Sequence, residues 1–261
     1  MMKKISGFPL VFLLMFSIGM TSCVTQKQVK YLQKRQADDT TSSYLQKRGP
    51  NYKLQPYDNL YIKIFSLDEK SYFFFNRQNS GLNSYNDYTE SALYLNSYTV
   101  NDSGYIDFPV VGKIYVKDHD VEQIKAMVQN KISQYLKETS IIVKLVNFKI
   151  TVLGEVRTPG EKKIYQDQLN IFEGISMAGD LTDFADRGKV ALIRKTGEGS
   201  KIIYLDLNSS NLLVSPYYQL QPNDIIYVAP LNIKRWGSET FPWALIFAGV
   251  TSLLLIMNYF K

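Results

Sequence analysis

Alternating hydrophobic and polar positions predict strands in several stretches of the chain. Over residues 60–64, leucine or isoleucine stands at every second position, as in a strand with one buried face. Around Gly112, two short runs of this kind flank a turn and predict a pair of strands. The predicted strands cover residues 60–65, 105–116 (two strands), 141–152, 189–194 and 201–207.

Helical spacing interrupts these strands twice. Asp120 can cap a helix, and the apolar side chains after it share one helical face: Val121, Ile124, Val128, Ile132 and Tyr135. Asn170 and Glu173 form a capping-box pattern that predicts a shorter helix, and Gly179 is placed to end it. The resulting order, β-β-α-β followed by β-α-β-β, predicts an α+β fold built from two modules.

The stretch between Asn76 and Asn96 is rich in Asn, Ser and Tyr and predicts a long loop. The tyrosine-rich segment from Tyr72 to Tyr98 is a candidate contact surface for glycan or for a neighbouring subunit. A variable surface loop without a binding role explains the same composition equally well.

One motif occurs twice in the sequence. Tyr52-Lys-Leu-Gln-Pro-Tyr-Asp58 precedes the first predicted strand, and Tyr218-Gln-Leu-Gln-Pro-Asn-Asp224 precedes another apolar run. In each copy the proline favours a turn, which the aspartate can close with hydrogen bonds to nearby backbone. The pair indicates either two related β modules or a favourable turn used twice by chance.

The N-terminus has the form of an export signal that ends at the only cysteine. Lys3 and Lys4 precede an apolar run from Phe8 to Met20, and two small residues then lead to Cys23. A thiol at a new N-terminus can be acylated, and each buried CH2 of an acyl chain contributes about 0.8 kcal/mol to membrane binding. We therefore predict that Cys23 carries the lipid of a lipoprotein. The alternatives are an ordinary secretory signal with a chance cysteine, or an uncleaved anchor.

An uncharged apolar stretch, Phe241 to Phe260, lies near the C-terminus. As a helix it would be about 30 Å long, the thickness of a hydrocarbon core, so it predicts a transmembrane helix. The alternative is a buried terminal helix of a soluble domain. Ala244, Ala248 and Ser252 would share one face of this helix, and small residues on one face let helices approach closely. They are the candidate positions for helix packing and self-association.

Composition and missing motifs narrow the function classes. The chain is 45% hydrophobic, enough for a packed core, and its +6 formal charge is scattered, which argues against a nucleic-acid partner. One cysteine and one histidine leave little material for a metal site or a catalytic triad. His119 lies between two aspartates, but a solvated turn before a helix is the favoured interpretation. The sequence contains no phosphate-loop, HExxH or Gly-x-Ser-x-Gly motif, so we expect no enzyme activity, metal or cofactor.

Taken together, several motifs resemble the outer-membrane polysaccharide export family, the Wza-type capsule exporters. The matching stretches are Tyr52–Ile64 and Tyr98–Gly112 for the export domain, and Ile150–Gly160, Leu169–Gly179 and Leu220–Asp224 for its soluble-ligand-binding β-grasp (SLBB) domain. The resemblance covers nearly the whole mature chain, in a short form similar to exporters of the Bacteroidetes group. The sequence departs from the family pattern in having one clear β-grasp copy and a C-terminal segment that is apolar nearly all round.

The resemblance implies a homo-oligomeric ring of outer-membrane lipoprotein subunits, mostly in the periplasm, through which polysaccharide passes without being cut. Its implied partners are polysaccharide, membrane lipid and an inner-membrane chain-length regulator with its polymerisation system. A bitopic envelope scaffold or a glycan-binding lipoprotein that forms no conduit is the alternative. The expected divisions are a signal peptide (1–22), a lipid-anchored tether (23–50), the export domain (51–148), the β-grasp domain (149–230), a basic linker (231–240) and a transmembrane helix (241–260).

In cells grown with labelled palmitate, we expect the wild-type protein to incorporate label and the Cys23→Ala variant to lose it, because the chain has no other thiol. Fluorography of the immunoprecipitated protein measures the label. Ser43→Ala, a matched change within the predicted tether, should keep it. An unlabelled wild-type protein would remove the lipid anchor from this interpretation.

Overall fold

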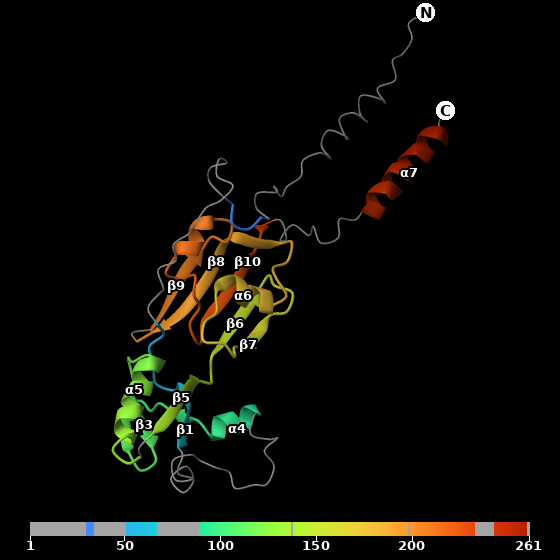
Figure 1. The fold of residues 1–261 in the computed structure, drawn as a ribbon. Coiled ribbons are helices and arrows are strands. Elements are labelled where there is room, and N and C mark those ends of the chain that lie inside the picture. The colour runs from blue at the N-terminus through green and yellow to red at the C-terminus, as the bar shows by residue number, and fades with distance from the viewer. Residues whose placement is uncertain are drawn as a thin grey trace, which may run out of the picture.

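The computed structural model describes residues 30–33, 51–66, 89–136, 138–197, 199–232 and 243–259. Two modules carry separate hydrophobic cores, one drawn from residues 54–143 and the other from residues 148–228. Figure 1 shows the two modules end to end, with the chain crossing between them after β5. The mixture of helices and strands confirms the predicted α+β class.

The first module is built on a three-stranded antiparallel sheet in which β1 lies between β2 and β5. Its elements are β1 (Asn59–Ser66), α4 (Glu90–Leu95), β2 (Tyr98–Thr99), β3 (Tyr105–Phe108), β4 (Gly112–Tyr115), α5 (Val121–Ile132) and β5 (Thr139–Leu145). Helix α5 packs against β5 and buries Ile124, Val128 and Ile132. The hairpin of β3 and β4 adds Ile106 and Ile114 to the same core.

The second module is a five-stranded sheet in the order β7-β6-β10-β8-β9. Its elements are β6 (Lys149–Gly154), β7 (Gly160–Lys163), α6 (Ile171–Met177), β8 (Ala185–Thr196), β9 (Gly199–Leu205), the 3-10 helix η1 (Ser210–Val214) and β10 (Ile225–Pro230). Strand β10 is central, parallel to β6 and antiparallel to β8. Helix α6 lies over one face of this sheet (Figure 1). Its Gly174 sits so close to the sheet that an added Cβ would lie 2.9 Å from the Ile150 side chain.

Both predicted helix starts are confirmed as capping boxes. The Asp120 carboxylate accepts a hydrogen bond from the Gln123 N–H at 2.8 Å, and the Gln123 side chain accepts one from the Asp120 N–H at 3.0 Å. Asn170 and Glu173 make the same reciprocal pair at the start of α6. Gly179, directly after the C-cap of α6, has a φ of +74°, a left-handed conformation that glycine adopts without strain.

Two predictions of secondary structure are wrong. The β-branched run 141–152 is not one strand, because the chain leaves the first sheet after Leu145 and enters the second at Lys149. Within the predicted loop 76–96, the final residues form α4, whose first turn is capped by the Thr89 side chain at 3.2 Å from the Ala92 N–H. Residues 67–88, with most of the tyrosine-rich candidate surface, lie outside the described residues.

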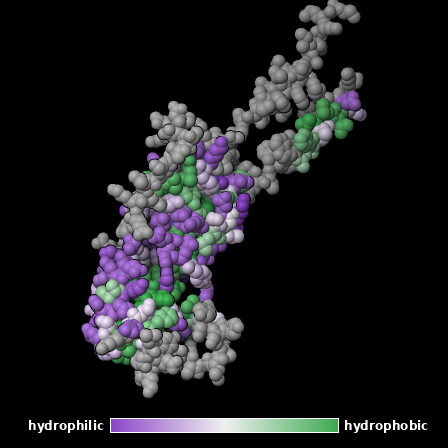
Figure 2. Space-filling view, viewed as in Figure 1, coloured by the Kyte–Doolittle hydropathy of each residue, from purple (hydrophilic) through white to green (hydrophobic). Residues whose placement is uncertain are grey.

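The predicted membrane-spanning helix is not supported. The C-terminal helix α7 spans Trp243–Tyr259 within the described residues. Figure 2 shows hydrophobic side chains along much of α7 and a hydrophilic C-terminal end. In the part of the chain that the structure describes, no helix is both long enough and apolar enough to cross a bilayer.

The repeated motif forms the same turn in both modules. Tyr57 and Asn223, the residues after each proline, have φ values of +75° and +65°. In the first copy the Asp58 carboxylate accepts a hydrogen bond from the Gln55 N–H at 2.8 Å, and in the second Asp224 accepts one from the Gln221 N–H at 2.7 Å. Both aspartates are almost fully buried, with 2% and 1% of their surface exposed.

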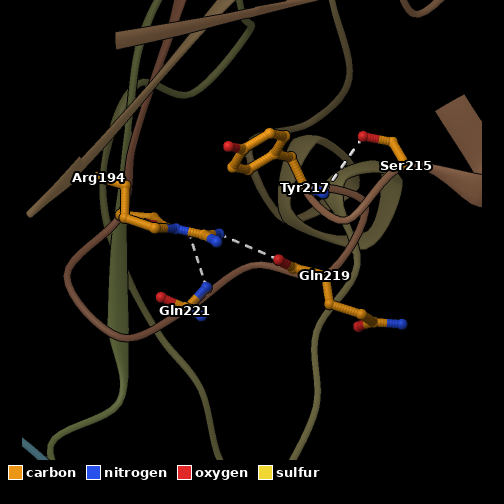
Figure 3. Close-up of polar contacts among 6 residues, drawn as sticks. Arg194, Ser215, Tyr217, Gln219 and Gln221 are labelled. Carbon is orange, nitrogen blue, oxygen red and sulfur yellow. Dashed lines mark hydrogen bonds and ion pairs between the residues drawn. The ribbon is translucent and has the colours of Figure 1, made fainter. Parts of the chain in front are cut away.

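The two buried aspartates have different partners. The Tyr52 hydroxyl donates to Asp58 at 2.8 Å, whereas Arg194 donates to both oxygens of Asp224 at 2.9 and 2.6 Å. Figure 3 shows the Arg194 side chain reaching the turn, where it also donates to the Gln219 carbonyl at 3.0 Å. Burial raises the pKa of the Asp58 carboxyl, and the hydrogen bonds that it accepts from the Gln55 N–H and the Tyr52 hydroxyl offset part of this effect. One turn is therefore closed by neutral donors and the other by a cation.

The sheets around the two turns differ, which limits the internal similarity. The first turn leads into β1, whose two neighbours are both antiparallel. The second turn leads into β10, which has a parallel neighbour in β6. The modules therefore share the turn and the strand that follows it, but they do not share a sheet topology.

A short segment between β5 and β6 joins the modules and is held by side-chain hydrogen bonds. Asn147 donates to the Tyr57 carbonyl at 3.2 Å and accepts from the Asn59 N–H at 3.0 Å, so the segment is bound to the first copy of the turn. An ion pair between Lys144 and Asp167 at 2.7 Å connects β5 to the second module.

We expect Arg194→Met to lower the free energy of unfolding by about 3–5 kcal/mol, because it leaves the buried Asp224 carboxylate without its cation. Burial raises the pKa of Asp224, so at low pH this carboxyl is protonated and carries no unpaired charge. The loss of stability in Arg194→Met relative to the wild type should therefore be smaller at low pH and should grow as pH rises. Urea unfolding followed by circular dichroism at several pH values measures this. Lys125→Met, at an exposed position on α5, should change stability by no more than about 0.5 kcal/mol. Equal effects of the two substitutions would contradict the prediction.

Candidate functional site

A groove of about 760 Å3 lies beside helix α6 on the second module. Three segments of the chain form it: the end of β7 with the residues after it, helix α6 with the residues before it, and the first residue of the second copy of the motif. Its lining residues are Lys163, Ile164, Tyr165, Gln166, Leu169, Asn170, Phe172, Glu173, Ser176, Met177 and Tyr218. The groove therefore combines aromatic, amide, hydroxyl and charged side chains.

Main-chain hydrogen bonds hold these segments together. The Ile171 N–H donates to the Tyr218 carbonyl at 3.0 Å, and the Leu220 N–H donates to the Leu169 carbonyl at 2.8 Å. Leu169, Ile171 and Leu220 are buried in the core of the module, so they fix the backbone beneath the groove. The second copy of the turn thus sets the position of Tyr218 relative to α6.

Aromatic side chains form one wall of the groove. The ring centroids of Phe172 and Tyr218 are 6.2 Å apart, and Tyr165 stands at the rim with 78% of its surface exposed. Burial raises the pKa of the Tyr218 hydroxyl, helped by the nearby Glu173 charge, so that hydroxyl stays protonated and available as a donor. Aromatic faces beside a few polar groups are typical of sites that bind small organic ligands.

The charged groups of the groove are largely engaged within the protein. Glu173 accepts a hydrogen bond from the Asn170 N–H at 2.8 Å as part of the helix cap. Lys163 forms an ion pair with Glu90 on α4 of the first module, and the Tyr165 hydroxyl donates to the same carboxylate at 3.1 Å. The hydrogen bond from Lys163, followed by that from Tyr165, lowers the pKa of Glu90. The groove rim therefore reaches across to the first module.

His119 lies in the first module, outside this groove. Its Nδ1 is 2.9 Å from the Lys117 carbonyl oxygen, and the Tyr115 ring stands edge-on to the imidazole. Asp120 beside it caps α5. The described geometry is a turn before a helix. Within the described residues, no cluster of three or more His, Cys, Asp or Glu side chains could hold a metal ion.

The residues singled out from the sequence are not brought together. Cys23 lies outside the described residues. Ala244, Ala248 and Ser252 lie on α7 with exposed side chains, and the Ser252 hydroxyl donates to the Ala248 carbonyl at 2.8 Å. Their role in helix packing stays a prediction. The groove itself was missed, because its aromatic residues come from segments whose proximity only the fold establishes. The capping box at Asn170 was its one visible sign.

Comparison with known proteins assigns both modules. Residues 46–146 match the family described as polysaccharide biosynthesis/export protein, and residues 148–228 match the SLBB domain. The chain belongs to the polysaccharide export family. The two matched ranges meet at the segment that contains Asn147, where the structure passes from the first hydrophobic core to the second.

Two curated relatives are similar to part of the chain. The EPS I polysaccharide export outer membrane protein EpsA of Ralstonia nicotianae is 26% identical over 104 residues, which is 38% of this chain and 27% of that protein. The protein of the same name from Ralstonia solanacearum is 27% identical over 107 residues, or 40% of this chain and 28% of the relative. The similarity thus spans little more than a quarter of either relative.

Proposed function

We propose that this chain is a non-enzymatic subunit of a polysaccharide export assembly at the outer membrane of the cell envelope. The observation that carries the proposal is the direct succession of an export module and an SLBB module over residues 46–228. The two relatives, both named as outer-membrane polysaccharide export proteins, support the same role. Acylation of Cys23 would attach the subunit to the membrane, and an inner-membrane chain-length regulator with its polymerisation system would deliver the polymer.

The groove beside α6 supports contact with glycan. Phe172 and Tyr218 offer aromatic faces, and Gln166, Asn170 and Ser176 add amide and hydroxyl groups. Because Lys163 and Glu173 are already engaged, the groove presents mainly neutral polar groups to a ligand. Such contacts suit a polymer that must bind weakly and move on. The proposed action is to guide glycan, with the chemistry of chain synthesis left to other proteins.

An apolar outer sheet face supports self-association. On β10, Ile226 and Val228 point into the core, yet the intervening Tyr227 is also apolar and is 42% exposed on the opposite face. Tyr227 is in register with Leu153 on β6 and with Ala191 on β8, which is itself in register with Tyr204 on β9. A sheet face in contact with water usually carries polar residues, and contiguous exposed apolar residues mark interaction sites. We infer that a second copy of this chain covers this face.

We expect Tyr165→Ala to weaken binding of oligosaccharides prepared from the polysaccharide of the producing strain by about tenfold, or about 1.4 kcal/mol. The substitution removes the exposed aromatic ring at the groove rim and leaves the core intact. Isothermal titration calorimetry on the full chain in detergent measures the affinity. Tyr135→Ala, an exposed tyrosine of the first module, is the matched control and should bind like the wild type. Equal affinities for all three proteins would exclude the groove as the glycan site.

We expect the wild-type protein in detergent to form multi-subunit particles, seen as closed rings by electron microscopy, and Tyr227→Lys to shift them toward monomer. A lysine on the outer face would have to bury its charge between copies. Light scattering after size-exclusion chromatography measures the particle mass. Tyr135→Lys should keep the wild-type mass, and unchanged urea midpoints would show that both variants fold. A monomeric wild type would instead favour a glycan-binding lipoprotein that forms no conduit.

A further inference from the structure

The segment Lys30–Gln33 lies against the second module, although the sequence predicts a tether there. The Leu32 N–H donates to the Leu207 carbonyl at 3.1 Å, and the Gln33 N–H donates to the Asn208 carbonyl. Gln33 pairs with Ser209 as a short parallel bridge. Figure 1 shows this segment in blue at the end of the second module that faces away from the first. These four residues of the predicted tether over residues 23–50 therefore contact the second module.

Tyr31 fills a socket made by three side chains of the second module. Its hydroxyl donates to the Asp180 carboxylate at 2.6 Å, and its ring meets that of Phe172 edge to face, with centroids 5.8 Å apart. The Arg187 guanidinium carbon lies 5.4 Å from the centroid of the Tyr31 ring, and Arg187 is only 5% exposed. The Tyr31 side chain is therefore held in one position by the buried Arg187 and by the Asp180 carboxylate. A flexible tether would not hold a side chain in a defined position.

The electrostatics of the socket favour the docked state. Burial alone would raise the pKa of Asp180, but the hydrogen bonds from Tyr31 and from the Leu181 N–H, with the charge of Arg187, bring it below the usual value. Burial and the hydrogen bond to Asp180 raise the pKa of Tyr31. Asp180 therefore stays charged and Tyr31 stays protonated over the physiological range. The contact is a charge-assisted hydrogen bond, which is stronger than one between neutral groups.

We propose that residues 30–33 are a docked strap that fixes the second module to the N-terminal attachment of the chain. Tyr31 lies eight positions after Cys23, and an extended chain over eight positions reaches about 26–29 Å. If Cys23 carries lipid, as the proposed function holds, the strap keeps the second module within that reach of the bilayer. Phe172 contacts Tyr31 and also lines the groove, so the strap supports the groove wall as well.

Hydrogen exchange tests the strap without reference to lipid or export. In the full chain in detergent, mass spectrometry of a peptide over residues 30–34 should show two slowly exchanging amides, those of Leu32 and Gln33. Tyr31→Ala should speed their exchange at least tenfold, and Tyr31→Phe, which keeps the ring but loses the hydroxyl, should fall between. Tyr165→Ala, outside the socket, should leave the peptide unchanged. Fast exchange in the wild type, or no effect of Tyr31→Ala, would overturn the proposal.

Paired insertions test the reach of the strap. One variant carries about twelve additional Gly and Ser residues between Gln28 and Val29, and a second carries them between Thr40 and Thr41. In both, a donor dye is attached at Ser200→Cys. The acylated protein is bound to vesicles that contain acceptor-labelled lipids. Only the first insertion should lower energy transfer to the lipids, since it lies between anchor and strap. Equal loss from both insertions, or none from either, would overturn the proposal. The energy-transfer measurement needs no export activity. Protein that fails to bind vesicles would contradict acylation of Cys23, which is part of the proposed function. The hydrogen-exchange experiment would still test whether residues 30–33 are docked.

Discussion

The capture of backbone N–H groups by a buried aspartate is the constraint on which the rest of this structure depends. In the second module, Asp224 closes the turn, and Arg194 holds Asp224 from the next strand of the sheet. The turn then directs Leu220 against Leu169 and starts β10 in the middle of the sheet. Both the core and the groove follow from that placement. An uncompensated carboxylate at this depth would be costly, so the arginine and the turn form one unit.

The same turn in the first module lies near its counterpart, at the junction of the two modules. The Asp224 charge contributes to the raised pKa of Tyr52, and the charge of Lys195 on β8 acts on Asp58. Each of these charges lies in the second module and affects the pKa of a residue in the first copy of the turn. Asn147 adds direct hydrogen bonds from the connecting segment to Tyr57 and Asn59. The junction therefore has specific polar contacts, in addition to the ion pairs that the two modules share.

Local features of the fold could be predicted from the sequence, and non-local ones could not. The alternation that defines β1 and the caps at Asp120 and Asn170 depend on residues a few positions apart, so the sequence displays them directly. The break in the run 141–152 is invisible locally, because β-branched residues suit both sheets equally well. The socket of Tyr31 combines residues about 150 positions apart, and only the fold brings them together. The presence of the C-terminal helix α7 could be predicted from the apolar composition of its residues, which is also a local feature.

The central position of β10 has a consequence for the order in which the second module can form. Its neighbours β6 and β8 are made earlier in the chain. Strand β6 pairs with β7 and strand β8 pairs with β9, and β10 is the strand that joins these two pairs. The sheet therefore lacks its middle until the last strand has left the ribosome or the secretion channel. Contacts between distant parts of a chain form slowly, and apolar strands without partners are prone to aggregate. Completion of the sheet therefore depends on β10 joining the β6–β7 and β8–β9 pairs, a contact between distant parts of the chain.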